Sequence, residues 1–85
     1  MLRKKLTHYD VLGVQEDANL DEIRKAFRRQ AIIWHPDRNR IPGAHERICA
    51  INAAYEMLSD EASRRRYDVI LQIRRRFQSK GKIMN

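Results

Sequence analysis

The sequence predicts an all-α fold in one small domain, and three observations support this. Glycine and proline are scarce, with three and two residues among 85, which disfavours a turn-rich β fold. Apolar residues recur at spacings of three and four, as on the buried face of a helix. Residues that can cap a helix stand before three of the expected helices. A chain this short has room for one compact core, so we expect no cofactor.

The first two expected helices have clear ends. Thr7 is a candidate N-cap with Asp10 three residues on, and Gly13 fits the stop of a short helix over residues 7–12. Asn19 with Glu22 three residues later resembles a capping box, with Asn in place of the usual Ser or Thr. A second, longer helix is therefore expected to begin directly after Asn19.

This second helix has two different faces. The expected apolar stripe comprises Ile23, Phe27, Ala31 and Trp34, with Ala26 at its edge. The opposite face carries the basic residues Arg24, Lys25, Arg28 and Arg29. Ile32 falls among these arginines, so we expect it to be exposed. Gln30 falls within the stripe, where it either finds a hydrogen-bond partner or costs about 1–3 kcal/mol. The helix should end at His35, because Pro36 disfavours the α conformation in the preceding residue.

Two more helices follow a loop over residues 35–43. Residues 44–58 carry apolar positions at spacings of three, four and three, namely Ile48, Ile51, Tyr55 and Leu58. A last helix begins near Glu61 after Ser59 or Asp60 as cap, and would continue to about Gln78 with a stripe of Val69, Ile70, Ile73 and Phe77. From Ser79 onward we expect disorder. The two long helices should pack as an antiparallel hairpin, with the first and last helices covering its flanks.

Charge is concentrated at the two ends. Residues 1–5 carry +3; residues 6–63 hold 7 basic and 10 acidic residues, net −3; residues 64–85 hold 8 basic residues and one Asp, net +7. Basic ends suit nucleic acid, acidic membrane surfaces or acidic proteins, or they simply keep a small protein soluble. The candidate nucleic-acid contacts are Arg74, Arg75, Arg76, Lys80 and Lys82.

A single cysteine, Cys49, excludes an intrachain disulfide and suggests a reducing compartment. The N-terminus lacks the apolar stretch of a secretory signal, and no apolar run is long enough to span a membrane. We therefore expect a cytoplasmic protein. His45 lies four residues before Cys49, a spacing that suits two metal ligands, but zinc needs three or four. We predict no metal site.

Several segments, in order, resemble the J-domain of DnaJ-type co-chaperones over residues 7–68. Residues 9–14 are similar to the opening segment of the family, and residues 21–29 resemble its basic second helix. His35, Pro36 and Asp37 match the signature tripeptide of the family. Residues 51–60 look like its third helix and exit turn, and Arg64, Tyr67 and Asp68 match its fourth helix. The resemblance divides the chain into a basic N-terminal extension (1–6), the J-domain (7–68) and a basic C-terminal extension (69–85).

The resemblance implies a function. J-domains bind the ATPase domain of a DnaK-type chaperone of the heat shock protein 70 family and stimulate its ATP hydrolysis, without being enzymes themselves. The expected contact residues are Arg24, Lys25, Arg28, Arg29 and Ile32 on the second helix, and His35, Pro36, Asp37, Arg38 and Asn39 in the loop. Asp37 suits a charge-assisted hydrogen bond with a partner arginine. We expect a monomer. The alternatives are a nucleic-acid-binding protein that uses the C-terminal basic segment, and a J-like interaction scaffold without ATPase stimulation.

The chain departs from the family pattern at a few places. Gln30 stands where the family usually has an apolar residue, Ile33 where Lys is common, and Cys49 at a commonly charged position. Nothing after Asp68 resembles the Gly/Phe-rich linker, the Cys-rich zinc module or the client-binding domains of larger members. The resemblance therefore implies a J-domain-only member if the chain is complete, and a fragment of a larger protein otherwise.

Overall fold

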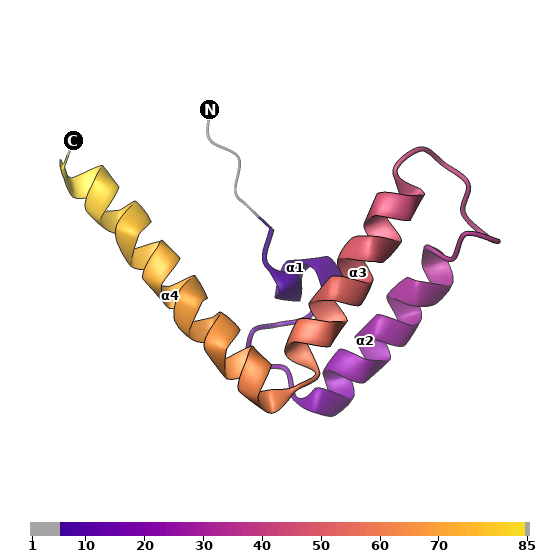
Figure 1. Ribbon diagram of the computed structural model, residues 1–85, viewed down its shortest axis with the longest axis horizontal. Coiled ribbons are helices and arrows are strands. Elements are labelled where there is room, and N and C mark those ends of the chain that lie inside the picture. Colours follow the sequence, from indigo (N-terminus) through magenta and orange to yellow (C-terminus); the bar gives the residue numbers. More distant parts are fainter. Residues whose placement is uncertain (1–5, 85) are drawn as a thin grey trace.

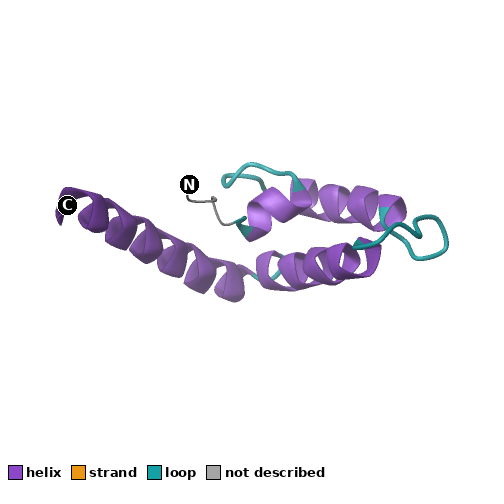
Figure 2. Cartoon of the chain, turned by 90° about the horizontal axis from the view of Figure 1, so that it is seen from above, coloured by secondary structure: helices purple, strands orange, loops and turns teal. Residues whose placement is uncertain are grey.

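The computed structural model describes residues 6–84, and the side chains of residues 6–77. These residues form four helices and no strand: α1 (His8–Leu12), α2 (Leu20–Ile33), α3 (Ala44–Leu58) and α4 (Glu61–Met84). The prediction of an all-α fold is confirmed. Figure 1 shows α2 and α3 side by side as an antiparallel hairpin, with α1 packed against it and α4 diverging from it. Figure 2 shows the same arrangement from above, with α4 extending away from the other helices.

The predicted helix starts are confirmed by their hydrogen bonds. The Thr7 hydroxyl accepts from the Asp10 N–H at 3.0 Å, and the Asp10 carboxylate accepts from the Thr7 N–H at 2.9 Å. Asn19 and Glu22 form the same reciprocal pair at the start of α2. Of the two candidate caps for α4, Asp60 is the one used, since its carboxylate accepts from the Ser63 N–H. That hydrogen bond lowers the pKa of Asp60.

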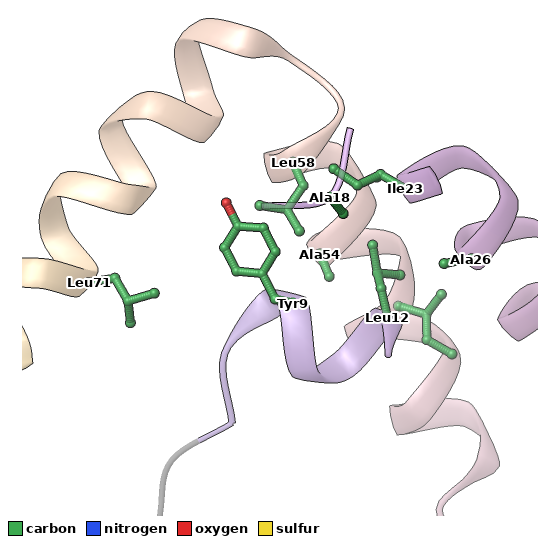
Figure 3. Close-up of a cluster of buried hydrophobic side chains, with 9 residues drawn as sticks. Tyr9, Leu12, Ala18, Ile23, Ala26, Ala54, Leu58 and Leu71 are labelled. Atoms are coloured by element: carbon green, nitrogen blue, oxygen red, sulfur yellow. The ribbon is translucent and has the colours of Figure 1, made fainter. Parts of the chain in front are cut away.

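A small core fills the space between α1, α2 and α3 (Figure 3). Its fully buried large side chains are Tyr9, Leu12, Ile23, Ile51 and Leu58. On α2 the core is centred on Ile23 and Ala26, because α3 faces that side of the helix. The rest of the predicted α2 stripe lies at the edge of the core: Phe27, Ala31 and Trp34 are half-buried. Phe27 stacks on Tyr55 with ring centroids 4.1 Å apart.

Gln30 also lies at this edge. It is half-buried, and its Nε2 atom would lie 3.7 Å from a Cβ atom placed on Gly13. Gly13 ends α1 with a φ of 76°, a left-handed conformation that glycine adopts without strain. The polar residue within the apolar stripe therefore packs beside the turn after α1 and is not enclosed in the core.

A polar network anchors the first half of α4 to α1 and to the connection after it. The Arg64 guanidinium donates to the Tyr9 hydroxyl at 3.0 Å and to the backbone carbonyls of Glu16 at 3.0 Å and Ala18 at 2.6 Å. The Tyr9 hydroxyl in turn donates to the Asp68 carboxylate at 2.6 Å. Burial, together with this bond to Asp68, raises the pKa of Tyr9. Tyr67 is half-buried, and its hydroxyl accepts from the His8 N–H.

Three expectations about the helices are corrected. Helix α2 ends at Ile33 rather than His35, because Trp34 already leaves the helical conformation before the bend imposed by Pro36. Helix α4 continues to Met84 rather than ending near Gln78. No proline interrupts it, and one glycine costs a helix only about 1 kcal/mol. The predicted apolar stripe of α4 does not pack on the hairpin, since Val69, Ile70, Ile73 and Phe77 are all exposed and Leu71 is buried instead.

Candidate functional site

The four predicted basic residues lie on the exposed surface of α2. Arg24, Lys25, Arg28 and Arg29 are all exposed. Lys25 pairs with Asp21 one turn earlier, with its Nζ atom 3.2 Å from the carboxylate. Within the described part of the chain the three arginines have no ion pair. The surface therefore keeps most of its positive charge available to a partner.

Ile32 and Ile33 add apolar surface to the end of α2. Their exposed fractions are 56% and 49%, which confirms the prediction for Ile32. Ile32 follows Arg28 by four residues, so the two side chains lie on the same side of the helix. The helix thus offers an apolar contact directly beside its positive charge.

The His35-Pro36-Asp37 tripeptide forms the start of the loop that leaves α2, at the tip of the hairpin (Figure 1). The His35 Nδ1 atom accepts from the Asp37 N–H at 3.2 Å, which places the ring proton on Nε2 in the neutral imidazole. The same Nδ1 atom lies 3.8 Å from the Asp37 carboxylate. The Asp37 side chain is 88% exposed. A partner cation can reach it without any movement of this loop.

Asn39 organises the loop from within. Its side-chain amide donates to the Ile33 carbonyl at 3.3 Å, and its side-chain oxygen accepts from the Ile41 N–H at 3.3 Å. The first bond satisfies a carbonyl left unpaired at the end of α2. Asn39 therefore joins the loop to the helix, while the neighbouring Arg38 is exposed.

Sequence reasoning missed the support that α3 gives to the base of this loop. The Arg47 guanidinium lies over the Trp34 ring, 5.3 Å from its centroid. Trp34 is the C-cap residue of α2, directly before His35. The Arg47 Nε atom is buried without a hydrogen-bond partner, so the contact with the ring holds this side chain in place. Sequence periodicity and spacing do not predict a contact such as this one between Arg47 and Trp34, because Arg47 lies on α3 whereas Trp34 caps α2.

Arg74, Arg75 and Arg76 differ in their surroundings on α4. Arg75 forms a two-pronged ion pair with Glu16, which raises the pKa of Arg75. Arg74 lies near His8, and its charge together with burial lowers the pKa of that histidine. Consecutive helical residues point about 100° apart, so Arg76 points in a third direction. The side chains of Lys80 and Lys82 lie outside the described residues.

The remaining candidate groups form no metal site. His45 Nε2 and Cys49 Sγ lie 3.7 Å apart on α3, and both residues are exposed. No group of three potential metal ligands exists among the described residues. None of the helices over residues 6–84 is long and apolar enough to cross a membrane.

An all-α hairpin with its charged side chains exposed has the layout of a protein-interaction domain. Residues 7–68 match the sequence profile of a protein family described as the DnaJ domain. That range is more than half of the chain. The chain therefore belongs to the DnaJ-domain family, whose members are co-chaperones and not enzymes.

Individual relatives agree with this assignment. A chaperone protein DnaJ of Gloeothece citriformis is 54% identical over 61 residues, which cover 72% of this chain and 16% of the relative. One of Trichormus variabilis is 52% identical over the same length. One of Roseiflexus sp. strain RS-1 is 53% identical over 64 residues, covering 75% of this chain and 17% of the relative. The chain thus spans about a sixth of the length of these relatives.

Proposed function

We propose that this chain docks on the ATPase domain of a DnaK-type chaperone and stimulates its ATP hydrolysis. The docking surface consists of the exposed side of α2 and the loop after it: Arg24, Lys25, Arg28, Arg29, Ile32, His35, Pro36, Asp37 and Arg38. The observation that carries the proposal is the exposed Asp37 carboxylate, held next to a helix whose arginines have no partner among the described residues.

The positive surface of α2 supports the first step, which is encounter. Its uncompensated arginines favour approach to an acidic surface, and this attraction raises association rates more than it raises affinity. Ile32 adds an apolar contact within the same surface, because its exposed side chain follows Arg28 by one helical turn. The approach of a partner to α2 also brings it to the loop, since the loop begins where α2 ends.

The loop supports the second step, which is activation. Asp37 suits a charge-assisted hydrogen bond to an arginine of the partner, a stronger bond than one between neutral groups. His35 holds the Asp37 backbone through its Nδ1 atom, and Asn39 joins the loop to α2. We assign both to positioning of the Asp37 carboxylate. A loop whose backbone is already held loses less entropy on binding, so the loop geometry favours the contact.

The test is steady-state ATP turnover by a DnaK-type chaperone with and without this protein. We expect the wild type to raise turnover, and Asp37→Asn and His35→Gln to abolish most of that increase. The matched control is Glu56→Gln, which removes one exposed carboxylate from α3 and should leave the increase unchanged.

Unchanged turnover with the folded wild type would overturn the proposal and favour a J-like scaffold without ATPase stimulation. Circular dichroism of each variant separates a lost contact from a lost fold. Asn39→Ala adds a second readout for positioning. It should raise the protein concentration needed for half-maximal stimulation, because the loop is less ordered while Asp37 remains.

A further inference from the structure

The side of α4 that faces away from the hairpin carries an amphipathic surface that the proposed function does not use. We call it the outer face of α4, and it consists of Arg66, Val69, Ile70, Ile73, Arg76 and Phe77. These residues recur at spacings of three and four, the pattern of one side of a helix. The opposite side of α4 is occupied, because it carries the buried Leu71 and the anchored Arg64 and Arg75.

The outer face is apolar and basic at once. The exposed fractions of its four apolar residues are 56% for Val69, 48% for Ile70, 45% for Ile73 and 68% for Phe77. Exposed apolar side chains that lie together on one side of a helix are typical of an interaction surface, whereas single ones are common on any protein. Arg66 and Arg76 are also exposed, and the outer face contains no acidic residue. Its partner should therefore be both negatively charged and able to accept apolar side chains.

We propose that the outer face of α4 binds the surface of an acidic phospholipid membrane, with the helix lying in the interface. A basic amphipathic helix buries its apolar side chains at the boundary of headgroups and acyl chains, while its cations meet the lipid phosphates. Arg66 and Arg76 lie in line with the apolar residues, and their long stems let the guanidinium groups reach the headgroup level. In Figure 1 and Figure 2 α4 projects from the other helices, in agreement with the exposure of the four apolar side chains on this face.

Other occupants explain the outer face less well. A second copy of the chain would bring arginines against arginines or against apolar residues, since this face has no acidic side chain for them. Nucleic acid would use the arginines for its phosphates but leaves four exposed apolar side chains without a role. An acidic membrane accounts for both groups. The proposal does not depend on the one for the docking surface, because the two surfaces lie on different helices.

The test is flotation of the 85-residue chain with vesicles of phosphatidylcholine alone or mixed with phosphatidylglycerol. We expect binding only to the acidic vesicles, and loss of that binding at about 1 M salt, where electrostatic screening acts within about 3 Å. The double variant Ile73→Ser/Phe77→Ser should bind at least about tenfold more weakly, because it removes two large apolar side chains. Both residues are exposed, so the variant should retain its fold.

The matched control is Ile41→Ser, which removes an exposed apolar side chain from the loop between α2 and α3 and should leave vesicle binding unchanged. Absence of binding to acidic vesicles would overturn the proposal. Equal binding by the double variant would also overturn it, because charge alone would then explain adsorption. A concentration-dependent dimer in sedimentation that the double variant abolishes would assign the outer face to a second copy. Oligonucleotide binding that the double variant weakens equally would assign it to nucleic acid.

Discussion

Helices α2 and α4 are both rich in arginine, yet the structure uses their arginines in opposite ways. On α4, Arg64 donates three hydrogen bonds to α1 and the segment after it, and Arg75 pairs with Glu16. On α2, Arg28 and Arg29 are exposed and have no ion pair within the described residues. Arg64 and Arg75 of α4 join that helix to the rest of the fold, whereas Arg28 and Arg29 of α2 are available to a partner.

The difference teaches that the groups around an arginine, rather than the charge itself, decide what it does. Arg64 is half-buried and donates to the backbone carbonyls of Glu16 and Ala18, of which Ala18 is buried. A buried polar group left without a hydrogen bond costs about 1–3 kcal/mol. Around Arg28 no buried group depends on the guanidinium, so its removal should leave the fold intact.

The sharpest test of this comparison is Arg64→Ala. We expect the free energy of unfolding to fall by about 2–3 kcal/mol, because two carbonyls and the Tyr9 hydroxyl lose a charged donor. Urea denaturation followed by circular dichroism measures it. A change below about 0.5 kcal/mol, the usual range for surface substitutions, would contradict the anchoring role of this side chain.

Arg28→Ala should have the converse effect. The free energy of unfolding should stay within about 0.5 kcal/mol of the wild type, while stimulation of the chaperone ATPase should fall several-fold at low salt. The matched control is Arg65→Ala on α4, which removes an exposed arginine that pairs with Glu61 one turn earlier. If Arg65→Ala lowers stimulation as much as Arg28→Ala does, the net charge of the protein matters rather than the surface of α2.

The ion pair between Arg75 and Glu16 should have a smaller effect. Both side chains are about half exposed, at 50% and 48%, so water screens the pair. Glu16→Gln should lower the free energy of unfolding by no more than about 1 kcal/mol, and the difference from the wild type should shrink as salt is added. If Glu16→Gln lowers the free energy of unfolding by more than this and salt does not reduce the difference, Arg75 stabilises the fold in the way proposed for Arg64.

The smallest expected effect is a pH dependence from His8 at the contact between α1 and α4. Burial and the nearby Arg74 lower the pKa of His8, whose ring lies 4.6 Å from that of Tyr67. Because the unfolded state then binds the proton more readily, stability should fall as pH drops below about 6.5. His8→Gln should remove that part of the pH dependence of the denaturation midpoint. An unchanged pH dependence in this variant would assign it to other groups.

Local patterns were sufficient to predict the helices and their starts. The capping pairs at Thr7 and Asn19 involve residues three apart, so the sequence contains both partners. The predicted end of α4 near Gln78 is wrong. Chain ends often fray, but this segment contains no proline and only one glycine, so the helix continues. The exposed position of Ile32 followed from helical periodicity alone, since its neighbours one turn away are charged.

Tertiary structure alone decided which arginines are anchored and which apolar face is left open. Arg64 and Arg28 have the same side chain, and only the position of α4 in the fold brings the Glu16 and Ala18 carbonyls within reach of one of them. Periodicity predicted the stripe of Val69, Ile70, Ile73 and Phe77, but α4 turns the side with Leu71 inward and leaves Phe77 exposed. Periodicity reveals that a helix has two faces, whereas the direction in which a helix leaves the body depends on contacts between residues distant in sequence.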